Sequence, residues 1–172
     1  MSNQKFIANI DLTTLRQKAE QKRKQHEKWV AKLKSRTPKH LDQHINEKHH
    51  QLFENIDCLE CANCCKTTSP LLLQSDIVTI AAHLKMKPGD FIQKYVIMDE
   101  DGDFVFHQTP CPFLGQDNYC SIYEVRPKAC KEYPHTQQRK QLSIIEITLE
   151  NVAICPAVFR IFDEIEREFE VK

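Results

Sequence analysis

The segment Cys58-Leu-Glu-Cys61-Ala-Asn-Cys64-Cys65 places four of the chain's eight cysteines within eight residues. So many thiols in one place have three common explanations: disulfide bonds, a catalytic cysteine, or metal coordination. A Cys-x2-Cys step forms a tight turn that points two thiolates at one metal ion. Because this step occurs twice in succession, from Cys58 to Cys61 and from Cys61 to Cys64, the segment favours metal coordination.

The same spacing opens the cysteine run of bacterial ferredoxins, in which a further cysteine ligand is followed by proline. In this chain no Cys-Pro follows at that distance, and Cys65 comes directly after Cys64. Two remote cysteines, Cys111 and Cys155, are each followed by proline. Either of them could complete a centre that begins with three local ligands.

The adjacent pair Cys64 and Cys65 suggests how eight thiols divide. Side chains of neighbouring residues diverge along the backbone, so these two are expected to serve different centres, or different atoms of one cluster. One predicted group contains Cys58, Cys61, Cys64 and one of the Cys-Pro cysteines. The other contains Cys65, Cys120, Cys130 and the remaining Cys-Pro cysteine. Cys155 has apolar neighbours, and packing alone could also explain it.

Disulfide bonds and a catalytic cysteine have less support than metal coordination. The first residues lack the uninterrupted apolar stretch of a secretory signal, and no apolar run is long enough to span a bilayer. The protein is therefore expected in the cytoplasm, where thiols stay reduced. A catalytic cysteine would need a base, for which His107 and His135 are the available candidates. His107 is expected at the surface and His135 could substitute as a ligand, so no catalytic constellation is identified.

Charge divides the chain into two parts. Residues 1–50 contain 12 Lys and Arg against 5 Asp and Glu, whereas residues 51–172 contain 12 against 19. The first part contains no cysteine. We therefore predict a basic helical hairpin over residues 1–55 and a cysteine-bearing, metal-binding domain over residues 56–172. The hairpin could dock on the acidic remainder or bind a nucleic acid, and docking is favoured because a basic helical face is usually a solvated one.

Apolar spacing and capping residues predict mainly helices with a few short strands. Helices are predicted over 11–35, 38–55, 75–84, 90–96, 127–133 and 156–169. Asp11 or Thr13 is expected to cap the first helix, and Thr37-Pro38 to begin the second. Strands are predicted over 95–98, 104–107 and 142–149, the first two joined by an acidic turn. The fold class is therefore α+β: a small, irregular, metal-centred domain preceded by a helical hairpin.

Three blocks of the sequence are similar to a known family. They are Cys58-x2-Cys61-x2-Cys64-Cys65, then Cys111-Pro-Phe-Leu, then Cys120-Ser-Ile-Tyr123-Glu-Val-Arg126-Pro127-Lys-Ala-Cys130. Together they resemble the YkgJ-type cysteine-cluster family of zinc- or iron-chelating domains. The resemblance implies that all eight cysteines are metal ligands and that Tyr123, Arg126 and Pro127 surround the centre. Arg126 could equally be a surface residue paired with Glu124 or Glu132.

Three functions are consistent with these observations. The first is a protein that binds zinc or iron, the iron as a single ion or as a [4Fe-4S] cluster, with a structural, redox or sensing role. The second is a metal-dependent or iron–sulfur enzyme, because flagellin lysine N-methylases look like relatives of this family and have a similar cysteine cluster. The third is a nucleic-acid- or ribosome-associated protein that uses the basic hairpin. Metal ions are the expected partners, a membrane is not expected, and no protein partner is indicated.

Overall fold

The computed structural model describes residues 10–169 and divides the chain into two compact units. The first unit combines both ends of the chain, Met1–Asp57 and Pro134–Lys172, and the second is formed by Cys58–Tyr133. The sequence placed one boundary near residue 56 but kept residues 134–172 with the cysteines. In the structure those residues belong with the N-terminal helices.

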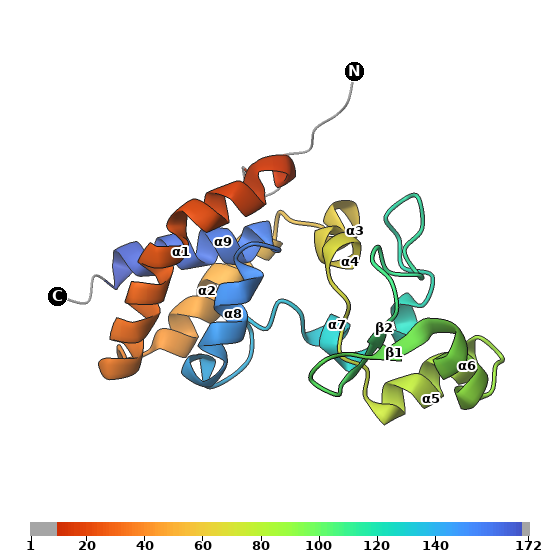
Figure 1. The fold of residues 1–172 in the computed structure, drawn as a ribbon. Helices are drawn as coiled ribbons and strands as arrows, with labels where there is room; N and C mark the ends of the chain where they lie inside the picture. The colour runs from red at the N-terminus through yellow and green to blue at the C-terminus, as the bar shows by residue number, and fades with distance from the viewer. Residues whose placement is uncertain (1–9, 170–172) are drawn as a thin grey trace, which may run out of the picture. The chain divides into compact units, whose positions relative to one another are not determined.

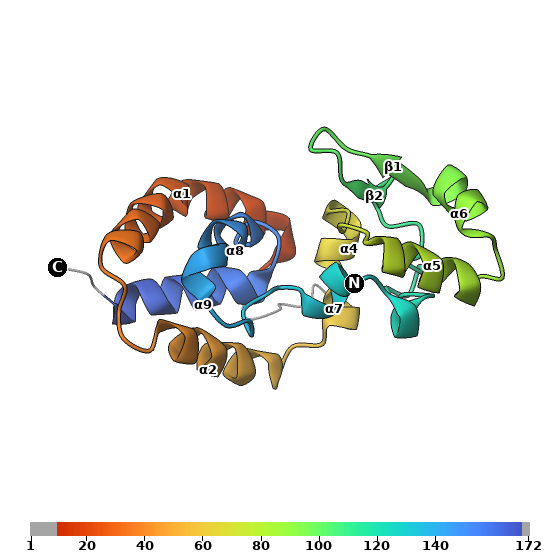
Figure 2. The ribbon, with the colours of Figure 1, turned by 90° about the horizontal axis from the view of Figure 1, so that it is seen from below.

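The first unit is a helical assembly that buries apolar faces from both ends of the chain (Figures 1 and 2). Its elements are α1 (Leu12–Ser35), α2 (Leu41–Phe53), a 3-10 turn (Gln141–Ile144), α8 (Ile145–Asn151) and α9 (Pro156–Glu168). Trp29 of α1 packs edge-on against Phe162 of α9, with ring centroids 5.5 Å apart. Both side chains are buried, as are Leu15, Leu33 and Ile165.

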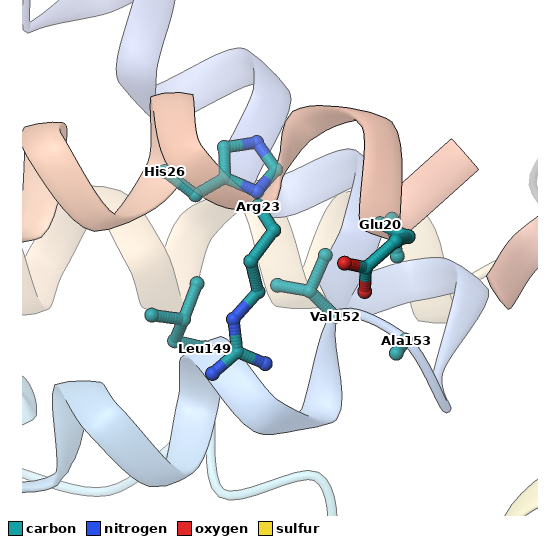
Figure 3. Close-up of a pocket in the computed structure, with 7 residues that line it drawn as sticks. Glu20, Arg23, His26, Leu149, Val152 and Ala153 are labelled. Atoms are coloured by element: carbon teal, nitrogen blue, oxygen red, sulfur yellow. The ribbon is translucent and has the colours of Figure 1, made fainter. Parts of the chain in front are cut away.

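Ion pairs connect the basic helices to the acidic C-terminal ones within this unit. Lys22 contacts Asp163 at 2.5 Å, Lys34 contacts Glu146 at 2.5 Å, and Lys48 contacts Glu168 at 2.7 Å. Arg23 bonds to Glu150, and Figure 3 shows its side chain reaching from α1 toward α8, with Leu149 and Val152 on either side. Surface pairs such as Lys34 with Glu146 contribute at most about 1 kcal/mol each, so the apolar contacts dominate the docking.

The imidazole of His26 lies at the centre of the interface between α1 and α9 and is fully buried. Its Nε2 is 3.4 Å from Oδ1 of Asp163, the carboxylate that also accepts from Lys22. Burial lowers the pKa of His26 despite the nearby carboxylates Glu166 and Asp163. The cavity that His26, Glu20 and Arg23 help to line measures about 20 Å³ (Figure 3), room for a water molecule but not for a substrate.

Residues 142–149 form a helix instead of the predicted strand. Ile145, Thr148, Leu149 and Val152 recur at helical spacing and are all buried, and α8 packs against α1 and α9. The carboxylate of Asp42 accepts hydrogen bonds from the backbone N–H groups of Lys140 and Gln141, at 2.7 and 2.9 Å, and so anchors the preceding turn. Packing against distant helices therefore overrides the β propensity of this segment.

The helix ends show which local signals were decisive. Asp11 caps α1 as predicted, because its Oδ1 accepts from the Thr13 N–H at 2.9 Å. The second helix begins at Leu41 instead of Thr37-Pro38. The hydroxyl of Thr37 donates to the Leu33 carbonyl at 3.1 Å, so this residue completes the end of α1. His40 then turns the chain in a left-handed conformation, with φ of 64°.

The second unit has short helices, a hairpin and a small apolar core. Its helices are α3 (Cys58–Cys61), α4 (Asn63–Thr67), α5 (Gln74–His83), α6 (Pro88–Tyr95) and α7 (Lys128–Glu132), with a 3-10 turn at Tyr123–Val125. The strands β1 (Val96–Met98) and β2 (Phe104–Phe106) pair antiparallel, in the register Val96 to Phe106. The predicted β-hairpin of residues 95–98 and 104–107 and the predicted α+β fold class are confirmed. The core includes Ile77, Phe91, Phe106, Phe113 and Ile122.

Across residues 10–169 the structure contains no helix that is both long and apolar enough to cross a membrane.

His49 on α2 carries a buried imidazole whose protonation is coupled to the stability of the first unit. It is 9% exposed, its Nδ1 lies 2.7 Å from the Thr136 hydroxyl, and its ring stacks on Phe53 with centroids 4.3 Å apart. Burial, reinforced by the charge of neighbouring His50, lowers the pKa of His49 from 6.5 to about 4. The folded unit therefore holds this residue neutral at pH values where the unfolded chain protonates it.

We expect the first unit to lose stability as the pH falls from 6.5 to about 4. Between these values the unfolded chain binds the proton and the folded chain does not, so the loss is on the order of 3 kcal/mol. Denaturant titrations followed by the fluorescence of Trp29, the single tryptophan, measure it. His49→Gln should flatten the dependence in this range, and an identical pH profile for both proteins would contradict the assignment.

Candidate metal centre

Cys65 of the second unit lies within electrostatic reach of four other cysteines. Negative charge on Cys65 raises the pKa of Cys61, Cys111, Cys120 and Cys130. These residues come from separate segments: Cys61 ends α3, Cys65 lies in α4, Cys130 lies in α7, and Cys111 and Cys120 flank a loop after β2. The fold thus gathers thiols that are up to 69 positions apart in the sequence.

Backbone hydrogen bonds hold the loop between Cys111 and Cys120 against α4. The N–H of Cys111 donates to the carbonyl of Cys65 at 2.8 Å. Leu114 and Cys120 form an isolated antiparallel bridge, which brings the two ends of the loop together. Gly115 suits this bend, because a Cβ there would lie 3.1 Å from the Tyr119 carbonyl and 2.5 Å from Oδ1 of Asp117, whose side chain would have to move.

Phe113 anchors the same loop in the apolar core. Its ring lies 5.3 Å from that of Phe106 and 5.0 Å from that of Tyr95, centroid to centroid. Its carbonyl accepts the N–H of Ser121 at 2.9 Å. The side chain between Cys111 and Cys120 therefore fixes both cysteines to the hairpin and to α6.

Three of the thiols share a supporting turn. The backbone N–H two residues further along the chain donates to the sulfur in each case: Asn63 to Cys61, Phe113 to Cys111, and Ile122 to Cys120. Hydrogen bonds of this kind favour the thiolate over the thiol. They also orient the sulfur and adjust the electronic properties of a bound metal.

Burial opposes ionisation of the same thiols. Burial, with the neighbouring sulfurs as a smaller cause, raises the pKa of Cys111 to about 11 and that of Cys130 to about 12. Several thiolates can coexist here only when positive charge offsets their desolvation and mutual repulsion. Zinc and iron ions supply such charge and bind thiolate strongly, so the donor set fits either metal.

The side chains are gathered but do not form a closed coordination sphere. In the part of the chain that the structure describes, no three Cys, His, Asp or Glu side chains are already placed closely enough to hold a metal ion. Cys64 and Cys65, predicted to diverge, are in contact: the hydrogen bond from Cys64 is the main cause that lowers the pKa of Cys65 to about 7. Their thiols thus form a pair in this structure.

Two cations lie near the thiols, and both lower thiol pKa values. Arg126 acts on the pKa values of Cys120 and Cys130, and Lys66 on those of Cys61 and Cys65. The guanidinium of Arg126 lies 3.8 Å from the centre of the Tyr123 ring and donates to the Tyr123 carbonyl at 2.8 Å. Arg126 was among the residues predicted from the sequence, whereas Lys66 was not, although its position directly after Cys65 was a usable signal.

The remaining predicted residues occupy different places. Pro127 is buried and precedes α7. Cys58 begins α3 and is exposed. His107 is exposed and continues the β-ladder by donating its N–H to Tyr95. Cys155 and His135 belong to the first unit, where Cys155 precedes α9 and is 9% exposed, and the His135 carbonyl accepts from Gln141.

The metal-free protein should show a large spread of thiol reactivity. Because the thiolate is the nucleophile, Cys65 should react with iodoacetamide at pH 7.5 at least about tenfold faster than Cys111 or Cys130. Alkylation followed over time by peptide mass spectrometry measures this ratio. Cys64→Ala removes the hydrogen bond between the thiols of Cys64 and Cys65 and should slow the alkylation of Cys65. Equal alkylation rates at Cys65 and Cys130 would contradict the electrostatic arrangement.

The comparison with known families covers the segment that contains all eight cysteines. Residues 57–155 match the model of the CxxCxxCC family, which is described as a "Putative zinc- or iron-chelating domain". An uncharacterized protein of Methanocaldococcus jannaschii is 30% identical over 84 residues, which cover 47% of this chain and 45% of the relative. The chain thus spans about half the length of this curated relative. No solved structure matches the chain.

Proposed function

Because the chain belongs to the CxxCxxCC family of zinc- or iron-chelating domains, we propose that it holds a zinc or iron ion on Cys65, Cys111, Cys120 and Cys130. The observation that carries the proposal is the position of Cys65, whose charge acts on all three of the other sulfurs. All four residues lie in the second unit and inside the matched range.

The chemistry of the four thiols supports this choice. Four thiolates complete a tetrahedral zinc or iron site and leave no position open for a substrate. A closed site favours a structural role with zinc, and with iron it also permits electron transfer or redox sensing. The structural role has an energetic basis here, because the core of this unit is small and its sheet has two strands. Units of this size commonly need a metal or disulfides for stability.

The other four cysteines retain their predicted role as ligands. Cys58, Cys61 and Cys64 are separated by the Cys-x2-Cys steps, and Cys61 has the same N–H to sulfur bond as Cys111 and Cys120. We propose that this trio binds a second metal ion or a second part of a cluster. Cys155 is the remaining candidate ligand, and its contribution is measured by its own variant.

Serine substitution at the proposed site should remove metal and stability together. Cys65→Ser, Cys111→Ser, Cys120→Ser and Cys130→Ser should each lose one metal equivalent per chain and lower the melting temperature, since binding free energy at such sites is folding free energy. Elemental analysis and inorganic sulfide determination after anaerobic purification distinguish zinc, iron ions and an iron–sulfur cluster.

The matched control is Val78→Ser, which changes a 48% exposed side chain on α5 of the same unit and should keep its metal. Cys58→Ser, Cys61→Ser, Cys64→Ser and Cys155→Ser then reveal whether a second equivalent depends on the other cysteines. Full metal content and an unchanged melting curve in Cys65→Ser or Cys130→Ser would refute the proposed ligand set.

A further inference from the structure

We propose that the outer edge of β1 binds an extended, basic segment of a partner protein as an added strand. This interaction surface consists of the backbone edge of Val96–Met98, the apolar face formed by Ile97, Val105 and Leu71, and the acidic turn at residues 99–103. It lies within the second unit and does not depend on the identity of the metal.

The inner face of the small sheet is buried at Val96 and Phe106 and open at Met98, and both faces are apolar. Val96 and Phe106 oppose each other on the inner face and are 8% and 3% exposed. Ile97 opposes Val105, which is bridged in turn to Leu71, so these three side chains form a row across the other face. Ile97 is 48% exposed and Leu71 42% exposed. An exposed apolar row of this kind is typical of a recognition surface.

The hydrogen-bond pattern shows which edge of the sheet is open. On either side of β1, the Tyr95 carbonyl accepts from the His107 N–H at 3.0 Å, and the Asp99 N–H donates to the Asp103 carbonyl at 2.9 Å. His107 and Asp103 directly flank β2, so Tyr95 and Asp99 direct these groups toward it. Residues alternate along an antiparallel ladder, so the backbone N–H and C=O of Met98 point away from β2. Within residues 10–169, β2 is the one strand paired with β1. Met98 is 62% exposed.

The far edge of β2, by contrast, is already covered. The N–H of Leu72 donates to the Phe104 carbonyl at 2.8 Å, and the Ser69 hydroxyl accepts from the Phe106 N–H at 2.8 Å. Natural proteins usually protect open edges with charged residues or proline, or keep the edge strand very short. The edge strand Val96-Ile97-Met98 is short but contains neither a charged residue nor proline, so its open backbone groups remain accessible to an added strand.

Charge selects the kind of segment that can bind. The turn after β1 places four acidic residues among five positions, Asp99-Glu-Asp-Gly-Asp103. Asp99 uses its carboxylate within the turn, accepting from the N–H groups of Asp101 and Asp103. Glu100, Asp101 and Asp103 are exposed at the end of the open edge. A strand with lysine or arginine at that end gains electrostatic complementarity, whereas nucleic acids and anionic lipids are repelled.

A second copy of the chain fits this edge less well. Its own β1 offers three residues, because α6 continues up to Tyr95. The open backbone groups of this edge are the C=O of Val96 and the N–H and C=O of Met98, because the Val96 N–H already donates to the Ile92 carbonyl. A separate extended segment can pair with these groups, place an apolar side chain over Ile97, and present basic residues to the acidic turn after β1.

The test uses the full-length, metal-loaded protein and two fluorescent peptides. One alternates valine and threonine over six residues and ends in three lysines, and the other ends in three glutamates. Anisotropy should show about tenfold tighter binding of the lysine peptide, with a preference that weakens as salt is added. Ile97→Lys should abolish binding, and the double variant Glu100→Lys with Asp101→Lys should reverse the preference.

The matched control is Glu54→Lys, a charge change at an exposed position of the first unit, which should bind like the unchanged protein. Circular dichroism and metal content confirm that each variant is folded. Equal binding of both peptides, no binding of the lysine peptide, or full binding by Ile97→Lys would overturn the proposal. A dimer in light scattering that Ile97→Lys dissociates would show that a second copy occupies the edge.

Discussion

Mutual repulsion among half-buried thiolates is the constraint on which the cysteine-bearing unit depends. Burial raises the pKa of Cys130 to about 12, and negative charge on Cys65, Cys111 and Cys120 adds to this effect. A group of sulfurs in that position cannot ionise without compensating positive charge. The N–H donors of the loop, together with Arg126 and Lys66, supply a part of it. A bound zinc or iron ion would supply most of the remainder, which is why ligand binding and folding are expected to be coupled here.

The two units are not consecutive along the chain. Residues 58–133 interrupt a helical unit whose two parts lie at the ends of the sequence. That helical unit is held by apolar packing between α1, α2, α8 and α9 and by pairs such as Lys48 with Glu168. The net positive charge of the first fifty residues therefore has partners inside the protein, which leaves less of it available for a nucleic acid.

The sequence was most informative where a local signal determines local structure. The cap at Asp11 and the acidic turn of the β-hairpin act over a few residues, and their consequences could be predicted. The Cys-x2-Cys steps are equally local, and the metal coordination that they favour stays a prediction. The segment 142–149 could not be predicted, because packing of α8 against helices distant in sequence decides its conformation. For the same reason the membership of residues 134–172 in the N-terminal unit was missed. The N–H to sulfur hydrogen bonds could not be predicted from the sequence either, since they depend on the turn geometry at each cysteine.

The two units bury charge by different means. In the helical unit, His26 faces Asp163, and that carboxylate is also bonded to Lys22 and lies 3.6 Å from Arg167. The buried carboxylate of Asp163 thus has cationic partners of the same chain, and burial lowers the pKa of His26, which favours its neutral form. In the cysteine-bearing unit the half-buried sulfurs are of one kind, and thiolates cannot neutralise one another. Such a set of donors is stable in its ionised form only with a cation from outside the chain. Buried and half-buried charges need compensating charge nearby. In the helical unit other side chains of the chain supply it, whereas in the cysteine-bearing unit a bound metal ion would have to supply it.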